Sequence, residues 1–96
     1  MPLAFLDRVA EARIPDSARA VLLDMLPMTD DRGRIDVRGL GYFERPDGTQ
    51  RSRPWADIER AAGHLIQARI IERVEWVLEA EGHHIQCHGF RLLGAR

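Results

Sequence analysis

The spacing of the apolar residues changes near residue 70, and this change constrains the fold more than any other feature of the sequence. Residues 54–68 carry apolar side chains at helical spacing, namely Trp55, Ile58, Ala62, Leu65 and Ile66. Residues 70–79 then alternate as a β-strand does, and residues 85–93 form a second strand-like run. Glu81-Gly82-His83 separates the two runs, so we expect a long helix followed directly by a β-hairpin.

Two further helices are expected before the long helix. Residues 2–13 place Leu3, Leu6, Val9 and Ala10 on one side, and Pro15 ends this segment. Asp16 or Ser17 is expected to cap a second helix that runs to about residue 26, because a short polar side chain accepts the free N–H groups of a first turn. The apolar residues of this second helix have the most regular helical spacing in the chain and are Ala18, Val21, Leu22, Met25 and Leu26.

The segment between these helices and the long helix is less regular. Residues 29–33 have the composition of a turn, and residues 34–37 alternate as a short strand. Three glycines and the turn sequence Pro46-Asp47-Gly48 interrupt residues 38–53. We expect this stretch to be either a hairpin or a short helix followed by a loop.

The overall composition indicates one soluble domain that spans residues 1–96. Hydrophobic residues make up 45% and charged residues 30% of the 96 residues, and no apolar run approaches the ~20 residues that a membrane span needs. The start of the chain has a charged residue too early for a signal peptide, and the single Cys87 excludes an internal disulfide. We therefore expect a cytoplasmic protein without contact to a membrane.

The charges are distributed unevenly, although the net charge is −1. Residues 1–31 contain three arginines and six acidic residues, whereas residues 32–60 contain seven arginines and five acidic residues. All basic residues are arginines, which make bidentate contacts with phosphate, guanine or carboxylate groups. A coding sequence rich in G and C explains this preference equally simply.

The order of helix, helix, short strand, irregular region, long helix and hairpin resembles a winged helix-turn-helix domain. Residues 17–26 and 30–34 are similar to the first helix and following strand of such domains in phage replication and regulatory proteins, and residues 64–74 to the end of their recognition helix. The resemblance covers about a quarter of the chain. It implies an α+β fold of three helices with a short strand and a C-terminal hairpin wing. The chain departs from the family at residues 38–53, where an Ala- and Leu-rich second helix is usual.

The resemblance implies that the long helix reads the major groove of double-stranded DNA. The expected DNA-binding residues are Arg51, Arg53, Asp57, Arg60, His64, Gln67 and Arg91. In this hypothesis Arg60 contacts guanine and Gln67 contacts adenine, while Arg51 and Arg53 at the helix entry and Arg91 on the wing hold phosphates. The alternative is a solvated helix face on which Asp57 pairs with Arg60. Asp57 also repels phosphates, which favours the alternative.

Four potential metal ligands, His83, His84, Cys87 and His88, lie within six residues. Strand geometry places His84 and His88 on one face and Cys87 on the other, so we expect neither a metal nor another cofactor. The sequence contains no phosphate-binding glycine loop, nucleophile elbow or zinc-protease motif. We therefore do not expect an enzyme.

The aromatic residues bear on the remaining alternatives. We expect Trp55 and Trp76 in the core, although Trp55 at the helix start is also suited to anchor a partner. Val77 and Phe90 are expected on the outer face of the wing, where exposed apolar area favours a homodimer or a protein partner. The alternative function is accordingly a phage-type protein-binding module that inhibits or modulates a host machine, for example an anti-CRISPR protein. A purely structural dimer is a third possibility.

Overall fold

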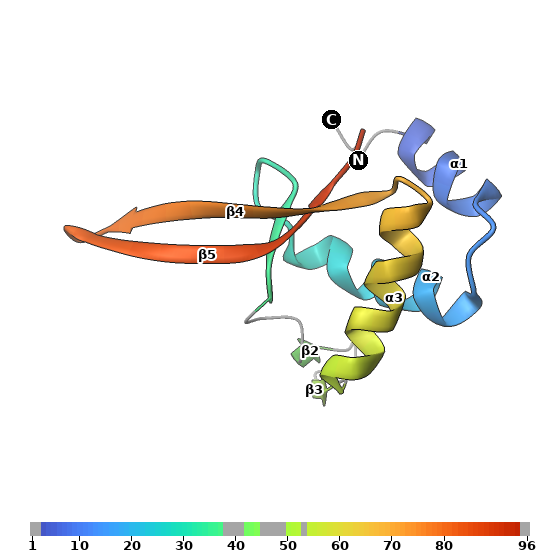
Figure 1. Cartoon of the computed structure of the whole chain (residues 1–96), viewed down its shortest axis with the longest axis horizontal. Coiled ribbons are helices and arrows are strands. Elements are labelled where there is room, and N and C mark those ends of the chain that lie inside the picture. The colour runs from blue at the N-terminus through green and yellow to red at the C-terminus, as the bar shows by residue number, and fades with distance from the viewer. Residues whose placement is uncertain (1–2, 38–41, 45–49, 53, 95–96) are drawn as a thin grey trace.

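The computed structural model describes residues 3–37, 42–44, 50–52 and 54–94, and these residues form an α+β fold. Within them, three α-helices gather at one end of the molecule, and a three-stranded antiparallel sheet extends away from them as a long hairpin (Figure 1). The expected α+β class is confirmed. No helix among the described residues has the length and apolar character needed to cross a membrane.

The first two helices pack their apolar sides into the common core. Helix α1 spans Leu3–Glu11 and buries Phe5 and Val9, whereas Leu6, expected in the core, is 40% exposed. Helix α2 spans Asp16–Met25 and buries four of the expected residues, Ala18, Val21, Leu22 and Met25. Pro15 occupies the N-cap without a side-chain hydrogen bond, so the expected cap by Asp16 or Ser17 is wrong. A 3-10 turn, η1 (Leu26–Met28), follows α2.

Helix α3 spans Trp55–Gln67 and packs against α2 through Ile58, Ala61, Ala62 and Leu65, all of them buried. Its end is a tight reversal, because Arg69 adopts a left-handed conformation with a φ of 59°. The N–H of Ile70 donates to the carbonyl of Leu65 (2.9 Å), which satisfies one carbonyl of the last turn and directs the chain into the sheet.

The sheet has the strand order β1-β5-β4. Strand β1 spans Arg34–Asp36, β4 spans Ile71–Ala80 and β5 spans His83–Leu92, close to the expected bounds. Strand β1 pairs with the end of β5, so that Asp36 lies opposite Gly89. A Cβ added at Gly89 would lie 1.8 Å from the carbonyl oxygen of Ile35, so the close approach of β1 requires glycine there.

Strands β2 (Tyr42–Glu44) and β3 (Gln50–Ser52) pair with each other in a separate two-stranded sheet. Of the two structures expected for residues 38–53, these described residues adopt the hairpin. The expected turn at Pro46-Asp47-Gly48 lies outside the described residues. At the position where the resembled family has its second helix, the described residues are therefore strands.

The two faces of the β4–β5 hairpin have different surroundings. We call the face toward the helices the inner face; its buried members are Ile71, Phe90 and Leu92. The opposite, outer face carries Trp76, which is paired with Cys87. Phe90 and Val77 were expected on the outer face, but both lie on the inner face. Phe90 is fully buried there, whereas Val77 is 55% exposed. Beyond Arg73 and Phe90 the hairpin projects past the helices (Figure 1), and most of its side chains become accessible, although Cys87 on the outer face stays buried.

Candidate binding cleft between helix α3 and the hairpin

A cleft of about 490 Å³ lies where the hairpin leaves the body of the protein beside the start of α3. Its lining residues are Val37, Trp55, Arg73, Val74, Glu75, His88 and Gly89. The indole of Trp55 stands at the first position of α3 and is 49% exposed, so the expectation that it packs in the core is wrong. Pro54 precedes it as the N-cap of α3 in an extended conformation, which starts the helix with Trp55 projecting beside the cleft.

An ion pair fixes one wall of the cleft to the other. Arg73 of β4 donates to both carboxylate oxygens of Glu59 on α3, at 2.8 and 3.4 Å. The Arg73 guanidinium also lies over the ring of Phe90, 5.3 Å from its centroid. Bidentate pairing and ring stacking together hold a planar guanidinium in one orientation. Helix α3 and the base of the hairpin are therefore positioned relative to each other before any partner binds.

The second guanidinium near the cleft is also paired. Arg60 donates to Asp57 one turn earlier in α3 at 3.2 Å, as in the solvated-face alternative. Both side chains are largely exposed, so this pair contributes little to stability. It does place a carboxylate within hydrogen-bonding distance of the arginine that was expected to read guanine, and the two charges largely cancel.

The side of the molecule formed by α3 and the inner face of the projecting hairpin is acidic. Its described charged side chains, histidines aside, are the carboxylates of Asp57, Glu59, Glu75 and Glu79 and the guanidiniums of Arg60 and Arg73. His84 lies 3.4 Å from Glu79 across the hairpin. Among the described residues, four carboxylates against two paired guanidiniums give a negative balance, which is unfavourable for phosphate binding.

The other DNA-binding residues expected on α3 lie elsewhere. His64 and Gln67, in the last turns of α3, line a separate hollow with Arg8, Glu11 and Arg13, beside α1. All the expected α3 side chains are exposed, but only His64 and Gln67 line this hollow. Asp57 and Arg60 line neither it nor the cleft beside Trp55.

The remaining expected DNA-binding residues are not among the residues that line the cleft beside Trp55. Arg91 lies on the outer face of the sheet, where it pairs with Glu72. Arg51 belongs to β3, and Arg53 lies outside the described residues. The structure thus distributes the described members of the expected site over three separate surfaces.

The histidine-rich segment has the geometry that its sequence predicts. His84 and His88 lie opposite Glu79 and Glu75 on the inner face, whereas Cys87 lies opposite Trp76 on the outer face. Cys87 is 2% exposed, so it is buried although it lies on the outer face. No group of three metal-ligating side chains occurs among the described residues.

None of the lining residues of the cleft belongs to the expected DNA-binding site, and the two that matter most for binding are Trp55 and Glu75. Trp55 was considered as a partner anchor only as an alternative, and its position directly after a proline at a helix start was the signal for exposure. Glu75 had no such signal, because its proximity to α3 arises only when β4 folds back beside the helix.

Comparison with known proteins gives no relative from which a function could be transferred. No protein-family model matches the chain, and neither a curated protein nor a solved structure matches it.

Proposed function

We propose that this chain is a non-catalytic, protein-binding domain of the winged-helix type, and that the cleft between α3 and the hairpin is its contact surface. The observation that carries the proposal is the half-exposed Trp55 beside a cleft whose one described lining guanidinium, that of Arg73, is already paired with a carboxylate. In the resembled family, this combination of long helix and wing meets DNA. Here the same elements present an aromatic side chain and a negative balance of charge.

The chemistry of the cleft suits a protein segment. Tryptophan is enriched among the residues that dominate binding energy in protein interfaces, because one rigid ring buries a large apolar area at little cost in conformational entropy. The carboxylate of Glu75 makes no ion pair or hydrogen bond with any described residue. We therefore expect a partner that places an apolar side chain on Trp55 and a basic side chain near Glu75. The single cysteine fits a reducing compartment, so we assign this interaction to the cytoplasm.

The proposal is tested by placing a photo-reactive amino acid at Trp55 and, as a matched control, at Leu23. Leu23 is similarly exposed, at 53%, but lies on α2 away from the cleft. After irradiation in an extract of the native cells, position 55 is expected to give a defined protein adduct that position 23 does not give. Equal labelling from both positions, or an adduct to nucleic acid from position 55, would overturn the proposal.

Double-stranded DNA is the second candidate. The order of elements favours it, because α3 is followed by a projecting hairpin as a recognition helix is followed by a wing. The seven arginines in residues 32–60 also favour it. Gel shifts separate the candidates. If α3 contacts phosphates, Arg60→Ala weakens binding and lowers the salt slope by about one, whereas Asp57→Ala strengthens binding. No shift with the wild-type chain rejects this candidate.

A further inference from the structure

Between the Glu72–Arg91 pair at its base and His83 near its tip, the outer face of the projecting hairpin carries apolar side chains. In register, Val74 and Trp76 of β4 are followed by Leu78, which pairs with Ile85 of β5. Leu78 is 46% exposed, and Val74, Trp76 and Ile85 are partly exposed. On the inner face the corresponding pairs are mostly polar. A hairpin whose polar face lies toward the helices and whose apolar face lies toward solvent has the reverse of the usual arrangement.

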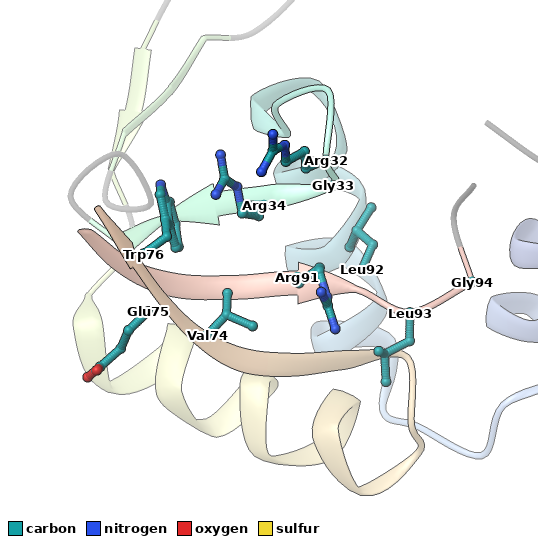
Figure 2. A pocket seen from close by; sticks show the side chains of 10 residues that line it. All are labelled: Arg32, Gly33, Arg34, Val74, Glu75, Trp76, Arg91, Leu92, Leu93 and Gly94. Carbon is teal, nitrogen blue, oxygen red and sulfur yellow. The ribbon is translucent and has the colours of Figure 1, made fainter. Parts of the chain in front are cut away.

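At the base of this face, a hollow of about 660 Å³ is surrounded by three arginines (Figure 2). Arg34 lies over the ring of Trp76, 4.8 Å from its centroid, and also pairs with Asp30 at 2.7 Å. Arg91 is paired with Glu72. The guanidinium of Arg32 makes no ion pair or hydrogen bond with any described residue, and Figure 2 shows it directed to the same side as Arg34.

At the tip of the hairpin, a carboxylate occupies a strained position. The two loop residues, Glu81 and Gly82, have φ angles of 51° and 78°. A two-residue loop with both angles positive is usually formed by Asn-Gly or Asp-Gly, because other side chains are strained in this conformation. The Glu81 carboxylate makes no ion pair or hydrogen bond within the described part of the chain. Strain at an exposed position of this kind is more common at sites that contact something.

We propose that two copies of this chain pack through the outer faces of their hairpins, antiparallel, with the Glu81 tip of each copy in the arginine hollow of the other. This inference does not rest on the proposed function, because Val74 is the one residue that it shares with the described lining of the cleft at Trp55. The second copy supplies what each feature lacks: an apolar cover for Val74, Trp76 and Leu78, an anion for Arg32, and a cation for Glu81.

The dimensions of the hairpin agree with a two-fold axis near Trp76. Strand β4 runs from residue 71 to residue 80, so Trp76 lies at its middle. At about 3.3 Å per residue, Glu81 lies about 17 Å beyond Trp76. Glu72, which pairs with Arg91 beside the hollow, lies about 13 Å before Trp76. An antiparallel pair centred on Trp76 therefore superimposes the tip of one copy on the hollow of the other at both ends. A two-fold interface requires such self-complementarity.

Sedimentation of the purified full chain over a range of concentrations tests the apolar part of the interface. The wild-type chain is expected to dimerise, and Leu78→Ser to weaken the dimer about a hundredfold, since both symmetric copies lose a buried leucine at roughly tenfold each. The matched control is Val77→Ser, which changes the preceding residue, 55% exposed but on the inner face, and is expected to leave dimerisation unchanged. A chain that stays monomeric, or equal weakening by both substitutions, would overturn the proposal.

A charge exchange tests the pairing of tip and hollow. Arg32→Glu and Glu81→Arg are each expected to weaken the dimer about tenfold, because like charges then meet at both ends. The double variant exchanges the two charges and is expected to restore dimerisation, while circular dichroism confirms that each variant folds. Two single effects that simply add in the double variant would show that residues 32 and 81 do not meet. Cross-linking at Trp55 reports on the protein-binding proposal separately, whichever result is obtained here.

Discussion

Substitution of Gly89 by alanine tests how the hairpin is attached to the body of the protein. The added Cβ would lie 1.8 Å from the carbonyl oxygen of Ile35, 2.9 Å from its carbonyl carbon and 3.2 Å from the Cα of Asp36, whereas ordinary contact begins at 3.4 Å. These neighbours are backbone atoms, so a side-chain rotation cannot relieve the overlap. Strand β1 must move away from β5 by about 1.5 Å, which is more than its hydrogen bonds tolerate.

The cost follows from what β1 loses by moving. Strand β1 pairs with β5 at three residues, and Ile35 in its middle is fully buried. Losing two or three hydrogen bonds at about 1 kcal/mol each, and part of the roughly 2 kcal/mol from burying isoleucine, gives a destabilisation of about 3–4 kcal/mol. Urea denaturation followed by circular dichroism measures this difference.

Gly63→Ala is the matched control for this experiment. A Cβ at Gly63 meets nothing within 4 Å, and the residue lies on the exposed side of α3. The substitution is expected to stabilise the protein by about 0.5–1 kcal/mol, because alanine loses less backbone freedom in a helix than glycine does. If Gly89→Ala cost less than about 1 kcal/mol, the described contact between β1 and β5 would be wrong.

Three further predictions concern stability. Burial raises the pKa of Asp30, but hydrogen bonds from Arg34 and Arg32 and the charge of Arg34 outweigh it, so the pKa is lowered. The stabilisation from Asp30 is therefore present above the ordinary aspartate pKa and lost as the pH falls through the lowered value, and Asp30→Asn should flatten this acid dependence in urea denaturation. Arg69→Gly should increase the free energy of unfolding by about 0.5 kcal/mol, which a slightly higher thermal midpoint would report, since glycine relieves the left-handed strain. Arg8 donates to two carbonyl groups at the ends of α3 and β5, at 2.5 and 2.7 Å, so Arg8→Ala should cost about 1–2 kcal/mol and speed hydrogen exchange in α1.

Local patterns in the sequence predicted the elements of this fold because each pattern reports on a few neighbouring residues. The period of the apolar residues located α2, α3, β4 and β5, and the turn at Glu81-Gly82 joined the two long strands as expected. The same reasoning assigned the wrong face of the hairpin to the core. Alternation indicates that a strand has an apolar face, but only the base of this hairpin touches helices, and there the core residues are Ile71 and Phe90. Farther out, the large apolar side chains Trp76 and Leu78 lie on the opposite, outer face of the hairpin.

The candidate site was harder to predict because its charges are paired across the fold. Arg73 and Glu59 are fourteen residues apart, and Arg91 and Glu72 are nineteen apart. Arg60 and Arg91 were therefore expected to be available for DNA, whereas in the folded chain each of them is paired with a carboxylate. The pair of Asp57 and Arg60 was predictable, since residues three apart on a helix are neighbours. This pair favours the protein-binding proposal, because it places a carboxylate beside the arginine that was expected to contact guanine.

We propose that the cleft beside Trp55 receives a protein and that the negative balance of the described charges around it disfavours DNA. The most direct test is a fluorescence anisotropy titration of a random-sequence DNA duplex with the wild-type chain, at low salt and again at physiological salt. If the cleft binds a protein and not DNA, no saturable binding of the duplex is expected at either salt concentration. Saturable binding at low salt that weakens steeply as salt is added would contradict it.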